Sequence, residues 1–194
     1  MTKWMFDRVV AFSGLVMLLP IMALIAAGIK ASSPGHPVFF RQIRIGQHGK
    51  RFSILKFRTM KGEDTDHSVS VKNDERITSL GHFLRKYKLD ELPELWNVLV
   101  GDMSFVGPRP DVPGYADRLQ GDNQKILELK PGITGPATLK YRNEEELLAG
   151  QSNPVEYNDK IIWPDKIKIN RKYVDERTFM GDLKIILQTI FGSL

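Results

Sequence analysis

The hydrophobic pattern of the chain begins with an uninterrupted apolar run over residues 9–29. This run carries no charged side chain and is long enough to cross about 30 Å of hydrocarbon as a helix. Pro20 lies in its middle, where a proline removes one backbone hydrogen bond and bends a helix. Basic residues flank both ends, so the positive-inside rule gives no preferred direction: Lys3 and Arg8 before, Lys30, Arg41 and Arg44 after.

Three interpretations of this run compete. A cleaved signal peptide has a shorter apolar core and a small-residue cleavage site, which residues 26–28 match only weakly. A plain spanning helix tolerates a proline kink. A helix–break–helix that enters and leaves by the same face satisfies both basic flanks. The residues alone leave spanning and re-entry open.

The pattern changes after the apolar run. Residues 37–60 are rich in β-branched and aromatic side chains with partial alternation, and residues 46–49 form a turn signal, so a β-hairpin is predicted. A polar loop is expected over residues 61–74. Apolar residues then recur at helical spacing, which predicts an amphipathic helix ending near residue 88: Ile77, Leu80, Phe83, Leu84 and Tyr87.

Further helices are expected downstream. One should open at Asp90 and stop by Gly101, one should cover residues 115–129, and one should start near residue 158. A last helix should start near Asp182, with an apolar face that meets either the core or a membrane. The predicted fold class is α+β and mostly helical.

Composition narrows the function. The 194 residues suit about one domain, and 28 Lys+Arg against 23 Asp+Glu give a net charge of +5. This excess could serve nucleic acid, anionic lipid headgroups or a polyanionic small substrate. The absence of cysteine excludes disulfides, thiolate nucleophiles and cysteine-based zinc sites. The four histidines show no metal-ligand spacing.

Adjacent carboxylates, Asp90 and Glu91, stand at the predicted start of a helix. The simple interpretation is an N-cap, because Asp is favoured there and Pro93 suits the first turn. The catalytic interpretation uses the same geometry, since a helix start binds phosphate oxygens and keeps a nearby carboxylate ionised. Such a carboxylate can attack phosphorus, and Asp90 with Glu91 could hold a Mg²⁺ that bridges to substrate phosphates.

Basic residues supply the second half of such a site. Lys56 and Arg58 lie on the second predicted strand, Arg85 precedes Asp90 by five positions, and Arg109 stands between two prolines. Arginine presents a planar fork that matches phosphate, and a proline-restricted loop preorganises it. Each of these residues could instead be an ordinary solvated surface charge. Arg109 fits that alternative least, because the prolines restrict its backbone.

Seven short motifs, taken together and in this order, resemble the bacterial sugar transferases, the small monotopic phosphoglycosyl transferases. They are residues 56–60 (KFRTM), 89–93 (LDELP), 97–99 (NVL), 101–105 (GDMSF), 107–110 (GPRP), 131–135 (PGITG) and 182–185 (DLKI). The resemblance implies a re-entrant membrane helix broken at a proline, a helix-associated β-hairpin and amphipathic helices lying in the membrane interface.

The resemblance also implies a two-step reaction. Asp90 would attack the β-phosphate of a UDP-sugar, UMP would leave, and the phosphosugar would pass from the enzyme to polyprenol phosphate. Glu91 would assist Mg²⁺. The anion-binding positions implied are Lys56, Arg85, Arg109 and Arg142, and Asp182 matches an acidic position at the start of the terminal helix. Together with Arg58 on the second predicted strand, these are the expected substrate-binding residues.

Two positions depart from the family pattern. The helix break is commonly Ser-Pro, but here it is Leu19-Pro20, and a missing hydroxyl leaves the break angle less defined. Relatives often carry an acidic residue before the pair Tyr173-Val174, where this chain has Asn170. An acid–base or metal role at Asn170 is therefore not expected.

The expected enzyme acts at the cytoplasmic face of the bacterial inner membrane, with residues 1–32 as the membrane segment and residues 33–194 as the catalytic domain. Its expected partners are a UDP-sugar, polyprenol phosphate (undecaprenyl phosphate) and membrane lipids, with a homodimer left open. A non-catalytic membrane-bound scaffold of the same fold is the alternative. A nucleic-acid-binding protein is disfavoured, because the aromatic residues lie mostly in apolar stripes rather than among basic ones.

Overall fold

The computed structural model describes residues 3–61 and 76–192, so most of the predicted polar loop at 61–74 lies outside the described residues. The chain divides into two compact units. The described residues of unit 1 are 3–43, 53–61 and 76–101, and those of unit 2 are 44–52 and 102–192.

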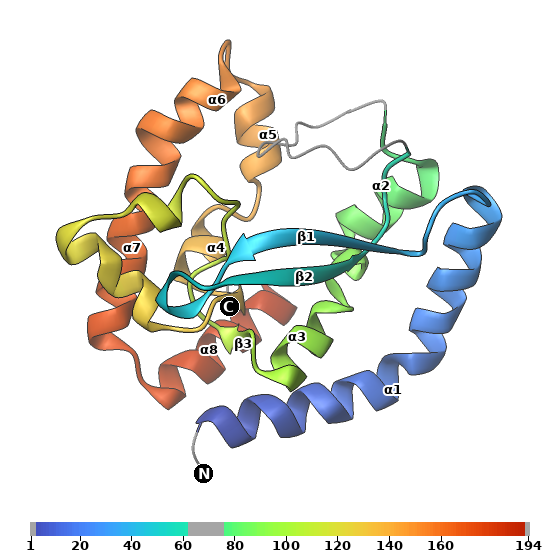
Figure 1. Cartoon of the computed structure of the whole chain (residues 1–194), viewed down its shortest axis with the longest axis horizontal. Helices are drawn as coiled ribbons and strands as arrows, with labels where there is room; N and C mark the ends of the chain where they lie inside the picture. The colour runs from blue at the N-terminus through green and yellow to red at the C-terminus, as the bar shows by residue number, and fades with distance from the viewer. Residues whose placement is uncertain (1–2, 62–75, 193–194) are drawn as a thin grey trace. The chain divides into compact units, whose positions relative to one another are not determined.

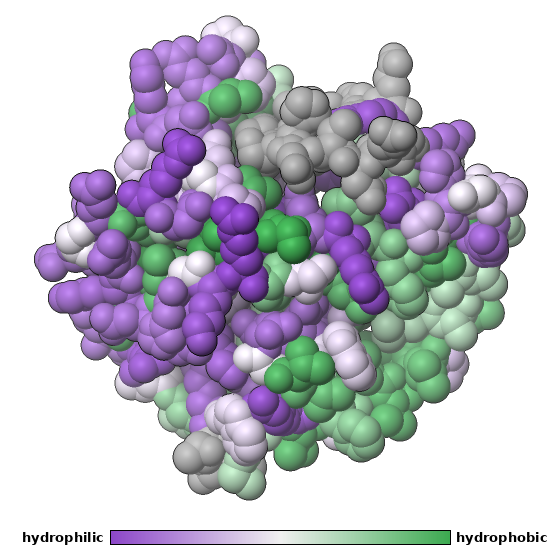
Figure 2. Space-filling view, viewed as in Figure 1, coloured by the Kyte–Doolittle hydropathy of each residue, from purple (hydrophilic) through white to green (hydrophobic). Residues whose placement is uncertain are grey.

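Unit 1 begins with helix α1, Lys3–Ser32, which contains Pro20. Figure 1 shows that α1 bends along its length, as a proline that removes one backbone hydrogen bond would cause. Among the described residues, α1 alone is long and apolar enough to cross a membrane by length and composition. Many of its hydrophobic side chains are exposed, Met17 at 79% and Leu24 at 74%, and Figure 2 shows apolar residues gathered over this helix.

The opposite side of α1 belongs to the core of unit 1. Ile25 and Ile29 pack with Phe57 and Leu84, with partly buried apolar residues around them. α1 also packs against α3, Glu94–Val100, and Gly14 brings its backbone close to Leu95. The N-terminal helix is thus anchored along one side and apolar on the other.

The predicted hairpin is confirmed. Strands β1, Phe39–Ile45, and β2, Arg51–Phe57, pair side by side and are joined by the turn η1, Gln47–Gly49. His48 and Gly49 adopt positive φ in that turn, as a tight connection requires. Residues 44–52, which include the turn of the hairpin, belong to unit 2, and the rest of the hairpin belongs to unit 1.

Helix α2, Ser79–Lys86, confirms the predicted amphipathic helix; the side chain of Thr78 caps it by accepting from the Gly81 N–H at 2.8 Å. The helix expected to open at Asp90 was predicted wrongly in its first turn. Residues Leu89–Glu91 form the 3₁₀ turn η2 after Lys88, which has φ of 56°, and α3 starts only at Glu94. Asp90 is therefore not the N-cap of α3.

Unit 2 contains two short parallel strands, β3, Ser104–Val106, and β4, Gly132–Thr134, with Ser104 opposite Gly132. The helix expected over 115–129 is instead a pair of 3₁₀ segments, η3, Ala116–Arg118, and η4, Gly121–Glu128. Gly121 explains the break, because its φ of 57° lies in the left-handed region.

The remaining elements of unit 2 are helical. They are α4, Pro136–Lys140, α5, Glu144–Ala149, α6, Pro154–Tyr157, the π-helix η5, Asn158–Ile162, α7, Trp163–Glu176, and α8, Phe179–Phe191. The predicted last helix is confirmed, but it starts three residues earlier because Thr178 caps it. Val106, Leu129 and Tyr173 form the core that joins β3 to α7.

Candidate functional site

Asp90 lies in the 3₁₀ turn of unit 1 and is only 9% exposed. Its Oδ1 atom has no hydrogen-bond partner among the residues that the structure describes. Burial raises the pKa of Asp90, and the neighbouring Glu91 raises it further, whereas Lys56, Lys88 and Arg85 lower it. A buried carboxylate oxygen without a protein partner is costly, so it marks a position where a ligand is expected.

Glu91 is held by the second strand of the hairpin. The Lys56 Nζ atom donates to Glu91 Oε1 at 2.9 Å and also lies 3.2 Å from Glu94 Oε1. Glu94 is 1% exposed, so this lysine compensates a fully buried carboxylate as well as Glu91. Sequence reasoning missed Glu94, although its position three residues after Glu91 was a usable signal.

The Asn97 side chain on α3 fixes the position of this helix along β2 by hydrogen bonds to the strand backbone. Its amide group donates to Ser53 O at 2.8 Å and accepts from the Leu55 N–H at 3.0 Å. These two hydrogen bonds hold the part of β2 that immediately precedes Lys56. The lysine is thereby placed next to Glu91. The geometry of this corner therefore comes from a side chain that mimics a strand partner.

The other basic residues predicted in unit 1 take two different places. Arg85 on α2 lies within electrostatic reach of Asp90. Arg58 donates its Nε–H to Pro37 O at 3.1 Å, is 9% exposed, and lies over the Phe40 ring. The structure thus brings together Asp90, Glu91, Lys56 and Arg85, while Arg58 holds the segment before the hairpin.

Arg109 lies in unit 2, in the loop that leaves β3. The Gly107 N–H donates to Thr134 O at 2.9 Å, and the Gly132 N–H donates to Pro108 O at 2.8 Å. A Cβ atom on Gly132 would collide with the backbone of Gly107, so glycine is required for this close approach. Two glycine-dependent backbone contacts, besides the prolines, hold the Arg109 loop in one conformation.

Arg142 and Asp182 make contacts that stabilise helix α8. Arg142 donates to Thr189 O at 2.7 Å and Gln188 O at 3.1 Å, which satisfies carbonyls at the helix C-terminus. Asp182 is 4% exposed and accepts from the Tyr173 hydroxyl at 2.5 Å, which ties α8 to α7. Asn170, also on α7, is 5% exposed, and its Oδ1 atom has no partner within the described part of the chain.

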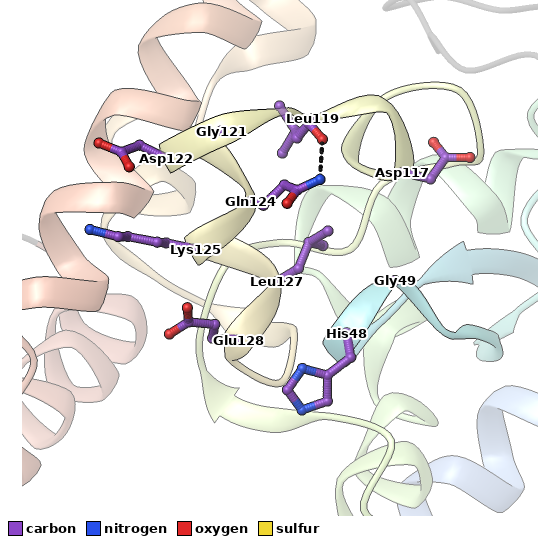
Figure 3. Close-up of a pocket in the computed structure, with 10 residues that line it drawn as sticks. All are labelled: His48, Gly49, Asp117, Leu119, Gly121, Asp122, Gln124, Lys125, Leu127 and Glu128. Carbon is purple, nitrogen blue, oxygen red and sulfur yellow. Dashed lines mark hydrogen bonds between the residues drawn. The ribbon is translucent and has the colours of Figure 1, made fainter.

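A hollow of about 530 Å³ lies in unit 2 beside the hairpin turn (Figure 3), and it contains none of the predicted site residues. Three carboxylates against one lysine make its charged lining acidic, which does not suit a phosphate. The lining residues are His48, Gly49, Asp117, Leu119, Gly121, Asp122, Gln124, Lys125, Leu127 and Glu128.

Comparison with known proteins decides the family. The sequence model described as "Bacterial sugar transferase" matches residues 1–194. The chain belongs to the bacterial sugar transferase family. Among its relatives in that family, the uncharacterized sugar transferase EpsL of Bacillus subtilis (strain 168) is 36% identical over 97% of this chain and 85% of EpsL. The exopolysaccharide production protein PSS of Rhizobium leguminosarum bv. phaseoli is 34% identical over 99% of this chain and 94% of PSS.

Other family relatives are much longer. The UDP-glucose:undecaprenyl-phosphate glucose-1-phosphate transferase of Escherichia coli (strain K12) is 37% identical over 95% of this chain, which spans 38% of that relative. The resemblance expected from the seven sequence motifs is thereby confirmed.

Proposed function

We propose that this chain transfers a sugar 1-phosphate from a UDP-sugar to polyprenol phosphate, undecaprenyl phosphate in bacteria, and releases UMP. The activities named for several relatives support this reaction, including the Escherichia coli protein and an undecaprenyl-phosphate galactose phosphotransferase of Salmonella typhimurium. The observation that carries the proposal is Asp90, a buried carboxylate whose Oδ1 atom has no protein hydrogen-bond partner among the described residues.

Asp90 is the nucleophile of the proposed reaction. One of its carboxylate oxygens forms a bond to the β-phosphorus of the UDP-sugar while the bond to the bridging oxygen breaks, and UMP leaves with those electrons. An oxygen of polyprenol phosphate then attacks the same phosphorus and releases Asp90 as a carboxylate. Because only the ionised form attacks, the cations Lys56, Lys88 and Arg85 favour the reaction by lowering the pKa that burial raises.

The residues fit a Mg²⁺ ion. This cation is typically held by one or two carboxylates together with substrate phosphates and water. Asp90 and Glu91 supply two adjacent carboxylates, and the Oδ1 atom of Asp90 has no hydrogen-bond partner among the described residues. The described residues contain no group of three or more acidic, histidine or cysteine ligands, which agrees with a site completed by the substrate. A bound Mg²⁺ would neutralise charge on the transferred phosphate.

The basic residues divide between direct and supporting roles in this proposal. Arg85 and Lys56 act on the charge at Asp90 and Glu91, and Arg109 binds substrate phosphate from a rigid loop. Arg58, Arg142 and Asp182 stay as proposed substrate-binding positions, and their observed contacts give each a supporting function in the fold.

The membrane arrangement is also proposed. Residues 1–32 form the membrane segment, which enters and leaves by the cytoplasmic face at the bend near Pro20, and residues 33–194 form the catalytic domain. Helices α2 and α8 lie in the interface, since each presents exposed apolar residues: Phe83, Met180, Leu187, Ile190 and Phe191. Both monomer and homodimer fit this arrangement.

The topology has a direct test, because the chain contains no cysteine. The variants Lys3→Cys and Gln42→Cys should react equally with an impermeant thiol reagent from the cytoplasmic side. Labelling from opposite sides would establish a spanning helix. Pro20→Ala should straighten α1 and shift part of the population to the spanning form.

A screen of UDP-sugars tests the activity. The purified protein in detergent, with Mg²⁺ and polyprenol phosphate, should release UMP from at least one UDP-sugar. The same fold acting as a non-catalytic scaffold would release none from any of them.

A further inference from the structure

Helix α8 presents two chemically different sides. The side that faces the rest of unit 2 carries residues spaced three and four apart: Asp182, Ile185, Ile186 and Thr189. The two isoleucines pack against the core around Val106, and Figure 1 shows α8 beside β3. The opposite side is exposed and mostly apolar, with one lysine: Met180, Lys184, Leu187 and Phe191. One side of α8 therefore suits a membrane surface, and the other is fixed to the strands.

Thr189 makes a polar contact on the inner side of α8. Its hydroxyl lies 2.7 Å from the hydroxyl of Thr134, the last residue of β4, and donates to Ile185 O at 2.8 Å. Because a hydroxyl carries a single hydrogen, Thr134 is the donor in the bond between the two threonines. Thr134 is 4% exposed, and its hydroxyl has no other hydrogen-bond partner among the described residues. Loss of the acceptor on Thr189 would leave a buried hydroxyl without a hydrogen bond, which is costly.

Thr134 also shapes the loop that carries Arg109. Its carbonyl oxygen accepts the Gly107 N–H at 2.9 Å, and it stands opposite Val106 in the parallel strand pair. Gly107 begins the turn that leads through Pro108 to Arg109. A single residue thus holds the Arg109 loop with its backbone and α8 with its side chain.

A second polar contact links α8 to the same strand end. The Tyr173 hydroxyl donates to Asp182 Oδ1 at 2.5 Å and lies 3.5 Å from Val106 O. The apolar contacts of α8 are non-directional and would let the helix slide, whereas hydrogen bonds require one position along its axis. Sliding of α8 would therefore disturb Val106 and Thr134, which adjoin Gly107 in sequence and by hydrogen bond.

We propose that Thr134 and Thr189 are positioning residues, through which the attachment of α8 to the membrane surface holds Arg109 in its working position. The proposal rests on the proposed function, because it takes from it the contact of α8 with the membrane and the action of Arg109 on substrate phosphate. It adds that these two parts are coupled, so that the transferase reaches its full rate when α8 is seated on the lipid. Neither threonine contacts the substrate.

Substitution of Thr189 tests the link. Thr189→Val keeps the size of the side chain and removes the acceptor, so it should lower the single-turnover rate of UMP release at saturating UDP-sugar by about tenfold. Thr189→Ser retains the hydroxyl and should keep the rate of the parent. Thr138→Val is the matched control, because the Thr138 hydroxyl is buried and makes no hydrogen bond among the described residues.

The double variant Thr134→Val/Thr189→Val separates positioning from stability. Thr189→Val alone buries the Thr134 hydroxyl without an acceptor and should lower the melting temperature. The double variant buries no such hydroxyl, so it should regain most of the lost stability. Its UMP release should stay slow, because the link is still absent. Recovery of the rate together with the stability would show that the threonine pair is only structural, which would overturn the proposal.

Two further combinations follow the coupling to its two ends. Thr189→Val should add little to the loss of rate caused by Arg109→Lys, because both changes act on the same side chain. Leu187→Gln, on the exposed side of α8, should slow the parent several-fold in vesicles of phosphatidylethanolamine and phosphatidylglycerol, with little further effect on Thr189→Val. Additive effects in either combination would overturn the coupling.

Hydrogen exchange on the full-length protein in the same vesicles measures the link without the reaction. The Gly107 N–H, which donates to Thr134 O, should exchange faster in Thr189→Val than in the parent or in Thr138→Val. If exchange changes in this way while the parent releases UMP from no UDP-sugar, the link between α8 and the loop stands and the proposed function falls. Unchanged exchange in Thr189→Val, with UMP release at the parental rate, would overturn the link and leave the proposed function intact.

Discussion

Asp90 in unit 1 and Asp111 in unit 2 are both carboxyl groups whose pKa is raised chiefly by burial, and three cations and one carboxylate act on each, but the order of these charged influences differs. Among the charged neighbours of Asp90, the acidic Glu91 has the largest effect on its pKa. The Oδ1 atom of Asp90 has no hydrogen-bond partner among the described residues. Asp111 has three cations as neighbours and one carboxylate, Glu144. The strongest charged influence is thus a carboxylate at Asp90 and a cation, Lys166, at Asp111.

The difference shows that burial alone does not define what a carboxyl group does. An acidic pair in which one carboxylate oxygen has no partner suits a nucleophile and a metal ligand, whereas a carboxyl group on which cations are the strongest charged influence suits an internal counter-ion of the fold. Substitutions that remove one setting while leaving the other should therefore have distinct and separable effects.

The largest effect is expected at Asp90. Asp90→Asn should reduce turnover by at least about 10⁴-fold, because an amide cannot form the acyl phosphate. Stability should be retained, since Oδ1 makes no hydrogen bond within the described protein that the substitution could break. Steady-state UMP release and a melting curve measure both, with Asp175→Asn as the control. Near-normal turnover in Asp90→Asn would remove the distinction between the two carboxyl groups.

The next largest effect is expected at Arg109. Arg109→Lys should keep the fold and membrane association but lower the single-turnover rate of UMP release by about one to three powers of ten. A lysine keeps the charge but cannot present the planar fork. Arg118→Lys, at an exposed arginine of the same unit, is the matched control. Equal rates in parent and Arg109→Lys would make Arg109 an ordinary charge.

The next effect concerns the stability of unit 1 and is tested at Lys56. Lys56→Met leaves Glu94, which is 1% exposed, and Glu91 without this cation, so unfolding should become easier by about 3 kcal/mol. The exposed pair Lys160–Glu156 provides the control, because Lys160→Met should change stability by no more than about 0.5 kcal/mol. Urea unfolding in detergent measures both. Similar losses in the two variants would mean that burial of Glu94 gives Lys56 no special role.

The smallest effect is expected in the pH dependence of stability, to which the titration of Asp111 contributes. A carboxyl group whose pKa is higher in the folded state stabilises the fold when protonated, and this contribution is lost as pH rises from about 4 through about 6. Asp111→Asn lacks the titrating group, so it should be more stable than the parent at pH 7.5, where the parent's carboxyl group is ionised, and nearly equal at pH 4. Unfolding at the two pH values checks the sign. A variant less stable at pH 7.5 would show that the cations hold the Asp111 carboxylate firmly.

Local sequence signals predicted the elements that depend on local physics. Alternation predicted the hairpin, helical spacing predicted α2 and α8, and the charge-free run predicted α1. The acidic pair was identifiable because it stands at the start of a predicted helix, and Arg109 because a proline on each side restricts its backbone. Re-entry at Pro20 is a property of the membrane and stays a prediction.

The errors have physical causes that a pattern does not show. Asp90 was interpreted as a potential cap, but Lys88 adopts a left-handed conformation and the chain makes a 3₁₀ turn before α3. Gly121 broke the helix expected over 115–129. Glu94 and Asp111 acquire their significance from Lys56, Arg44 and Lys166, which are distant in sequence.

The central claim is that Asp90 forms a covalent bond to the transferred phosphosugar. The protein, incubated with Mg²⁺ and its UDP-sugar but without polyprenol phosphate, should release about one equivalent of UMP and gain the mass of the phosphosugar. Fragmentation of the labelled peptide should place the added mass on Asp90, and added polyprenol phosphate should remove it. UMP release that requires polyprenol phosphate from the first turnover, with the chain unmodified, would contradict the account.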